Sequence, residues 1–137
     1  MQANNVQDMI NNNKVMIFSK SYCPFAAKAK KIFSDAGVAG CIVELDVVQG
    51  GDAMQSALKD LSGQRTVPNI YINGKHLGGC DDTISAAQNG KLKTMLNECG
   101  VANNLWLDLW INNTTFYLKI TKWNTKDIAL FPITLLI

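Results

Sequence analysis

The sequence predicts a small α/β domain in which helices cover both faces of a mixed sheet. Two observations carry this prediction. Residues 15–19 form an apolar run, a helical pattern follows up to Gly37, and residues 41–45 are apolar again, which favours a right-handed parallel crossover. Further along, Asn73 and Gly74 separate two short strand-like segments, and this dipeptide is typical of a tight hairpin turn.

The first half of the chain alternates between helical and strand patterns. Residues 3–12 have weak helical spacing, and residues 15–19 are apolar without alternation, as in a central strand covered on both faces. Pro24 suits the first turn of the next helix, where its missing N–H is harmless, and Gly37 ends that helix. Residues 41–45 are the second strand.

The second half adds helices around a hairpin. Asp52 is expected to cap one helix after the Gly50–Gly51 break, and Asp81 or Asp82 to cap another. The strands of the hairpin are expected at residues 69–72 and 75–77, and the last helix stops at Gly100. The buried faces expected for the two central helices are Phe25, Ala29, Ile32 and Ala36, and then Met54, Ala57, Leu58 and Leu61.

The composition changes after about residue 102. Residues 103–137 contain all three tryptophans and no Gly, Ser, Glu, Gln, Arg, His, Met, Cys or Val. Helical periodicity and amphipathic patterning are both absent there. We therefore predict a domain at residues 1–102 and a poorly ordered appendage outside it at residues 103–137. A membrane-surface or partner-binding tail is the alternative.

Charge and hydropathy argue against two classes of function. The net charge is +2 and the pI is about 8.3, and Lys28, Lys30 and Lys31 are best explained as the solvated side of a helix. A nucleic-acid partner is therefore not expected. A membrane span is not expected either, because no segment reaches about 18 uninterrupted apolar residues.

The opening residues and the cysteines indicate a reducing compartment. Residues 1–13 are polar and lack the features of a secretory or transit signal, so we expect a cytoplasmic protein. The four cysteines should then be free thiols. They lack paired C-x-x-C spacing, so no metal site is predicted.

Cys23 is the strongest candidate for chemistry. It follows the predicted strand at residues 15–19 after a short connection and opens the next helix just before Pro24. A sulfur at a helix start lies among unpaired N–H groups at the positive end of the helix dipole, which favours the nucleophilic thiolate. A small core residue is the alternative interpretation.

Three segments together resemble the glutaredoxin family. They read Lys-Ser-Tyr-Cys-Pro-Phe-Ala at residues 20–26, Arg-Thr-Val-Pro-Asn-Ile-Tyr-Ile-Asn-Gly at residues 65–74, and Gly-Gly-Cys-Asp-Asp at residues 78–82. Their order and separation make the signature specific, and it covers roughly residues 3–100. The resemblance implies a thioredoxin-like fold with a four-stranded mixed sheet. It also implies thiol–disulfide exchange in a monomer, with glutathione as cosubstrate and no tightly bound cofactor.

The resemblance implies a role for each matching residue around the sulfur. Cys23 is the nucleophile, and Lys20 supports its thiolate and meets a glutathione carboxylate. Phe25 takes the aromatic position beside the tripeptide. Pro68 resembles the family's cis-proline and turns the Val67 backbone toward the cysteinyl unit. The residues implied to bind glutathione are Lys20, Phe25, Gln55, Arg65, Thr66, Val67, Pro68, Gly79, Cys80, Asp81 and Asp82.

The two ends of the tripeptide have their own implied contacts. Gln55 and Arg65 match positions that contact the glycine carboxylate. Gly79 allows close approach of the backbone. The turn and helix start at residues 80–82 match those that hold the γ-glutamyl end. Cys80 itself is either a small residue in this turn, which we favour, or a second thiol that helps to resolve disulfides.

The departure from the family pattern is Ala26, where most relatives of this type have a second cysteine. Without it, the disulfide of the active-site turn cannot form. The one-thiol route at Cys23 remains, in which mixed disulfides of glutathione with proteins or small thiols are reduced. Two alternatives are a [2Fe–2S] cluster held between two subunits with glutathione, which Pro24 opposes, and a form that binds glutathionylated targets but handles dithiol substrates poorly.

Overall fold

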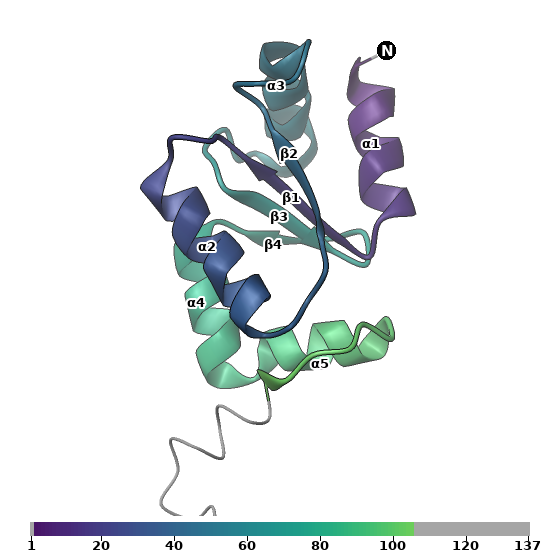
Figure 1. Cartoon of the computed structure of the whole chain (residues 1–137). Helices are drawn as coiled ribbons and strands as arrows, with labels where there is room; N and C mark the ends of the chain where they lie inside the picture. The colour runs from purple at the N-terminus through teal and green to yellow at the C-terminus, as the bar shows by residue number, and fades with distance from the viewer. Residues whose placement is uncertain (1, 106–137) are drawn as a thin grey trace, which may run out of the picture. The chain divides into compact units, whose positions relative to one another are not determined.

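The structure is a computed structural model, and it describes residues 2–105 of the chain. Its elements are α1 (Gln2–Asn12), β1 (Val15–Ser19), α2 (Pro24–Asp35), β2 (Cys41–Glu44), α3 (Gly51–Ser62), β3 (Asn69–Ile72), β4 (Lys75–Gly78), α4 (Cys80–Asn89) and α5 (Lys91–Glu98). The strands form one sheet in the order β2-β1-β3-β4 (Figure 1). β1 is parallel to β2 and antiparallel to β3, and β4 is antiparallel to β3. This confirms the predicted four-stranded mixed sheet.

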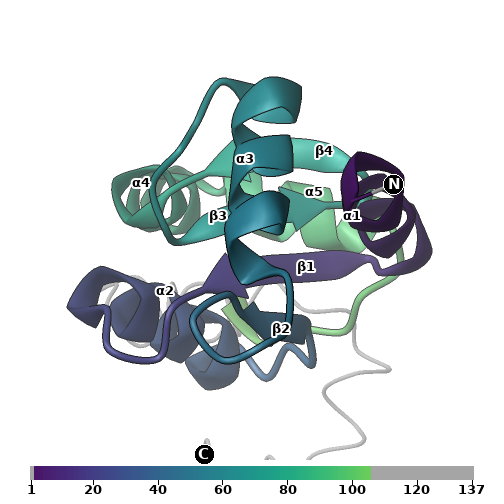
Figure 2. The same cartoon turned by 90° about the horizontal axis from the view of Figure 1, so that it is seen from above.

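Helices cover both faces of the sheet. Figures 1 and 2 show α1 and α3 side by side on one face, and α2 and α4 on the other. β1 lies between β2 and β3, and all five of its residues are buried. The lack of polar alternation at residues 15–19 is therefore explained by burial of the strand on both faces, as the sequence predicts.

The core under α1 and α3 is built around alternate residues of β1. Met16 and Phe18 point to this face, and neither side chain is accessible to solvent. The ring of Phe18 packs edge-to-face on Tyr71 of β3, with ring centroids 6.3 Å apart. The other buried members of this cluster are Val6, Ile10, Val43, Leu45, Met54, Ala57 and Leu58.

The hairpin between β3 and β4 has the predicted turn. Asn73 and Gly74 both have positive φ values, 52° and 79°. A two-residue turn with positive φ at both positions matches the twist of the strands that it joins, which explains why Asn-Gly is favoured there.

The buried face of α2 matches the predicted one in part: Ala29 and Ala36 are buried as expected, and Ile32 is half-buried. Ala26 and Phe33 are buried together with Ala29, whereas Phe25 is 61% exposed. A short helix with apolar residues at neighbouring positions allows more than one face, and packing on the sheet selects between them. In α3 the prediction also fails at Leu61, which is 44% exposed near the end of the helix.

Glycines take the N-cap positions predicted for aspartates in two helices, although the Asp82 carboxylate still caps α4 by accepting a hydrogen bond from the Gly79 N–H. Gly50 with φ 78° is the N-cap of α3, and Gly79 is the N-cap of α4. Asp52 and Asp82 lie inside the first turns of these helices instead. A carboxylate there still stabilises the positive end of the helix dipole.

The described residues reach slightly past the predicted domain boundary. The Asn104 N–H donates a hydrogen bond of 2.9 Å to the Ala36 carbonyl at the end of α2. The chain divides by its contacts into units 1–104 and 105–137. The assignment of residues 1–102 and 103–137 stays a prediction, because the appendage lies outside the described residues from residue 106 on. Among residues 2–105, no helix is long and apolar enough to cross a membrane.

Candidate functional site

Cys23 lies at the junction between β1 and α2. It is the N-cap of α2, with extended backbone (φ −83°, ψ 118°), and Pro24 follows as the first helical residue. A hydrogen bond of 3.0 Å from the Cys23 N–H to the Lys20 carbonyl closes the turn before it. Cys23 is only partly buried, and its remaining exposure lets a sulfur electrophile reach it from solvent.

The loop between β1 and α2, which contains Lys20, is hydrogen-bonded to the segment after β2. The Asp46 carboxylate accepts hydrogen bonds from the Ser21 hydroxyl and, at 2.8 Å, from the Ser21 N–H. These two bonds lower the pKa of Asp46 below its ordinary value, the hydroxyl having the larger effect. Lys20 adds a smaller electrostatic contribution. The ionised carboxylate therefore holds the backbone just before Cys23.

A groove of about 430 Å³ combines residues from three parts of the chain. The Val67 carbonyl oxygen lies 3.9 Å from the Cys23 sulfur. The peptide bond between Val67 and Pro68 is cis, as the sequence resemblance implies. The residues that line the groove are Phe25, Gln64, Thr66, Val67, Pro68, Gly79, Cys80, Asp81 and Asp82. Eight of these nine belong to the predicted site, all except Gln64.

The start of α4 forms one wall of this groove. The Gly79 N–H donates to the Asp82 carboxylate at 3.0 Å, and the Thr83 hydroxyl donates to the Gly79 carbonyl at 2.8 Å. The first N–H groups of a helix have no partner within the helix. Residues Cys80 and Asp81 therefore present a helix N-terminus beside an exposed carboxylate, an arrangement suited to a ligand that carries both an anion and an amine.

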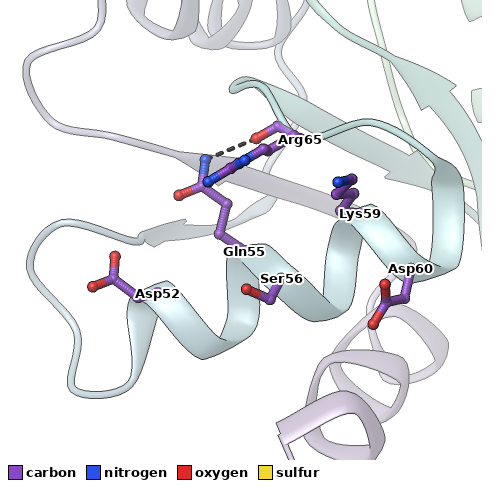
Figure 3. A pocket seen from close by; sticks show the side chains of 6 residues that line it. All are labelled: Asp52, Gln55, Ser56, Lys59, Asp60 and Arg65. Carbon is purple, nitrogen blue, oxygen red and sulfur yellow. Dashed lines mark hydrogen bonds between the residues drawn. The ribbon is translucent and has the colours of Figure 1, made fainter.

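Gln55 and Arg65 line a second, neighbouring pocket. The Gln55 amide nitrogen donates a hydrogen bond of 2.7 Å to the Arg65 carbonyl, and Figure 3 shows this side chain reaching from α3 to the loop. The other lining residues are Asp52, Ser56, Lys59 and Asp60. Arg65 and Lys59 supply positive charge here, while one of the two N–H bonds of the Gln55 amide is already used by the backbone.

Cys80 lies in the groove but differs from Cys23 in its surroundings. It is 7% exposed, and burial raises the pKa of its thiol above the ordinary range. Lys28 opposes this shift, and Asp81 and Cys23 add to it. At neutral pH, Cys80 is therefore a protonated thiol and a weak nucleophile.

This difference predicts how the thiol of Cys80 responds to alkylation. In the folded protein at pH 7, iodoacetamide should modify Cys80 much more slowly than Cys23, and the Cys80 rate should keep rising above pH 9. A raised pKa moves thiolate formation to higher pH, so the alkylation rate of Cys80 increases with pH over this range. Peptide mapping by mass spectrometry after timed alkylation measures both sites. Equal rates for the two thiols at pH 7 would contradict the assignment.

Two parts of the site were missed from the sequence. Gln64 directly precedes the segment at residues 65–74 but is not part of that signature. The pairing of Ser21 with Asp46 joins residues 25 apart in the chain. Neither is visible from local patterns. No disulfide joins the four cysteines. Within residues 2–105, no group of three or more His, Cys, Asp or Glu side chains is placed to hold a metal ion.

Comparison with known proteins gives one consistent result. The family model described as Glutaredoxin matches residues 15–77. Glutaredoxin-C6 from Oryza sativa subsp. japonica is 51% identical over 86 residues, which are 63% of this chain and 77% of that protein. Glutaredoxin-C4 from Arabidopsis thaliana is 46% identical over 99 residues, which are 72% of this chain and 73% of that protein.

Solved structures agree with the sequence comparison. A buckwheat glutaredoxin–glutathione complex is similar with a TM-score of 0.71 and 45% identity, covering 73% of this chain and 91% of that one. A wheat glutaredoxin gives a TM-score of 0.69 and 47% identity, covering 72% of this chain and 92% of that one. These similarities confirm the predicted thioredoxin-like fold.

Proposed function

The chain belongs to the glutaredoxin family of glutathione-related thiol oxidoreductases, and from this premise we propose that it reduces glutathione mixed disulfides with the single thiol of Cys23. The observation that carries the proposal is the position of this sulfur. It lies at a helix start and 3.9 Å from the Val67 carbonyl that lines the groove. Ala26, one helical turn further on, is fully buried and supplies no second thiol.

The reaction has two exchange steps. The Cys23 thiolate attacks the glutathionyl sulfur of the mixed disulfide, and the old S–S bond breaks. Its electron pair leaves with the target sulfur, which takes up a proton. The thiolate of free glutathione then attacks the Cys23–glutathione disulfide, which releases oxidised glutathione and restores the Cys23 thiolate. One free glutathione is consumed per target thiol released, and one protein sulfur is enough.

Glutathione is proposed to lie along the groove with its cysteinyl unit at Val67. The backbone N–H and C=O of Val67 can pair with this unit as in a β-strand. The γ-glutamyl end then meets the start of α4, where Asp81 is exposed in the groove wall. The buckwheat glutaredoxin of similar structure was solved with glutathione, which supports glutathione as the ligand here.

The glycine end of the tripeptide is proposed to reach the neighbouring pocket. Arg65 and Gln55 line it, and a guanidinium binds a carboxylate with two parallel hydrogen bonds. The remaining N–H of the Gln55 amide can donate to the same group. Lys20 is proposed to act from the other side of Cys23, through its positive charge. Thr66, Pro68, Gly79, Cys80 and Asp82 complete the proposed contacts.

A cysteine at position 26 tests the one-thiol mechanism. In the Ala26→Cys variant we expect reduction of protein disulfides to rise at least tenfold, because the second thiol can release a bound target as an internal disulfide forms. Reduction of glutathione mixed disulfides should change less than about threefold. Both rates are measured with glutathione reductase coupling. A wild-type protein that already reduces protein disulfides as fast as the variant would contradict the one-thiol assignment.

Cluster binding is the alternative within the same family. A [2Fe–2S] cluster shared by two subunits would use Cys23 of each together with glutathione. Pro24 fixes the backbone directly after Cys23, so we propose that the protein does not bind a cluster. After anaerobic reconstitution with iron, sulfide and glutathione it should stay colourless and monomeric. A visible absorption band eluting with a dimer would support the cluster instead.

The proposed substrates are glutathionylated proteins and small mixed disulfides. We also propose that the protein acts in the cytosol, where the reduced glutathione pool drives the second exchange step.

A further inference from the structure

The groove wall between α3 and β3 is held by glutamine side chains. The Gln64 amide nitrogen donates to the Thr66 carbonyl at 3.1 Å and to the Pro68 carbonyl at 2.8 Å. The Gln55 amide holds the Arg65 carbonyl in the same loop. These contacts fix the backbone of residues 65–68, and residues 66–68 form one wall of the groove.

The two bonds of Gln64 lie on either side of Val67. An amide nitrogen has two N–H bonds, and in Gln64 both are directed to backbone carbonyls. The carbonyls that they engage belong to Thr66 and Pro68, so the carbonyl of Val67 is left out of this arrangement. It lies instead 3.9 Å from the sulfur of Cys23. With the Arg65 carbonyl held by Gln55, three of the four carbonyls of residues 65–68 accept hydrogen bonds from glutamine side chains, and the carbonyl of Val67 faces the thiol.

The backbone of Gln64 is itself held by hydrogen bonds at both its N–H and its carbonyl. Its backbone N–H donates to the Ser62 hydroxyl at 3.1 Å, and that hydroxyl donates to the Leu58 carbonyl in α3 at 2.9 Å. Its backbone carbonyl accepts a hydrogen bond of 3.4 Å from the side-chain nitrogen of Asn69. The side-chain oxygen of Asn69 in turn pairs with the His76 ring at 2.9 Å. Asn69 is 1% exposed. The glutamine is therefore fixed to α3 on one side and to the β3–β4 hairpin on the other.

From this geometry we infer that Gln64 is a positioning residue that orients the Val67 backbone for the glutathionyl group. The inference deepens the proposed function and rests on it. Strand-like pairing requires the N–H and C=O of Val67 to be oriented before the ligand arrives, since an unconstrained loop would have to be ordered on binding. The pairing is made equally in the ground state and in the transition state, so its loss raises KM and leaves kcat nearly unchanged.

The main test replaces the amide by groups of similar length. Gln64→Glu keeps the shape but places an anionic oxygen against two carbonyl oxygens, and Gln64→Met keeps the length without any donor. The matched control is Gln7→Glu in α1, which also removes an amide donor, in this case to Asn11. The described residues of α1 do not line the groove.

We expect both Gln64 variants to raise the KM for a glutathionylated peptide about tenfold, with kcat within threefold of wild type. The rate of Cys23 alkylation by iodoacetamide and the melting temperature should stay close to wild type, since the thiol and the core are untouched. The Gln7 variant should match wild type in every reading. Using two Gln64 variants keeps the test valid if one of them fails to fold.

The outcomes separate the inference from the proposed function. Wild-type KM in a folded Gln64 variant, with wild-type protein active, would overturn the positioning role alone. A loss of kcat at unchanged KM would also overturn it, because binding would then not depend on the loop. A wild-type protein that transfers no glutathionyl group would overturn the proposed function and this inference together.

Discussion

Replacing Cys23 with serine is expected to lower the rate of glutathionyl transfer at least about 1000-fold, equivalent to roughly 4 kcal/mol in the barrier. A serine hydroxyl stays protonated near neutral pH, and an oxygen is a poor nucleophile toward a disulfide. Ala26 leaves no thiol in the same turn that could substitute for it. The measurement is a glutathione-reductase-coupled assay with a glutathionylated peptide.

The controls for this variant are the other thiols. Cys99 donates a hydrogen bond to the Leu96 carbonyl at the end of α5 and does not line the groove, so Cys99→Ser should keep wild-type activity. Cys80 lies in the groove, so the Cys80→Ser variant tests whether this second thiol has a role in the reaction. Activity retained in Cys23→Ser and lost in Cys80→Ser would move the chemistry to Cys80.

Replacing Phe18 with alanine is expected to lower the free energy of unfolding by about 3–5 kcal/mol. The side chain is fully buried in the core under α1 and α3, and its ring packs on Tyr71. Removing it deletes apolar contact area and leaves a cavity that the sheet cannot close. Urea denaturation followed by circular dichroism measures the change.

Phe25→Ala is the matched control, since it deletes the same atoms from a side chain that is 61% exposed. We expect a loss below about 1 kcal/mol, because little apolar area leaves water at that position. Similar losses for the two variants would contradict the assignment of Phe18 to the core and Phe25 to the surface of the groove.

Much of the fold could be predicted because local patterns report it directly. The apolar run at residues 15–19 indicates burial on both faces, and Asn73 with Gly74 indicates a tight turn. The face of α2 could not be predicted as securely. Phe25 and Ala26 are both apolar, and packing on the sheet, which is a long-range effect, decides that Ala26 goes inside. The N-cap position of Gly79 is a similar case, because a glycine has no side chain that could signal it, and Asp82 caps the helix from its first turn instead.

The candidate site was predictable in its chemistry and less so in its supports. Cys23 and the segment with Val67 and Pro68 carry recognisable residue types in a recognisable order. Gln64 does not, because its function depends on which carbonyls its amide reaches in three dimensions. The contact between Ser21 and Asp46 is hidden for the same reason, since it joins two loops that are distant in the sequence.

Mass spectrometry of the protein after treatment with oxidised glutathione tests the central claim most directly. We predict one glutathionyl adduct per chain, mapped to the peptide that contains Cys23, with Cys41, Cys80 and Cys99 unmodified. Free glutathione should then remove this adduct. An unmodified Cys23, or an adduct found first on another cysteine, would contradict the assignment of this sulfur as the reacting group.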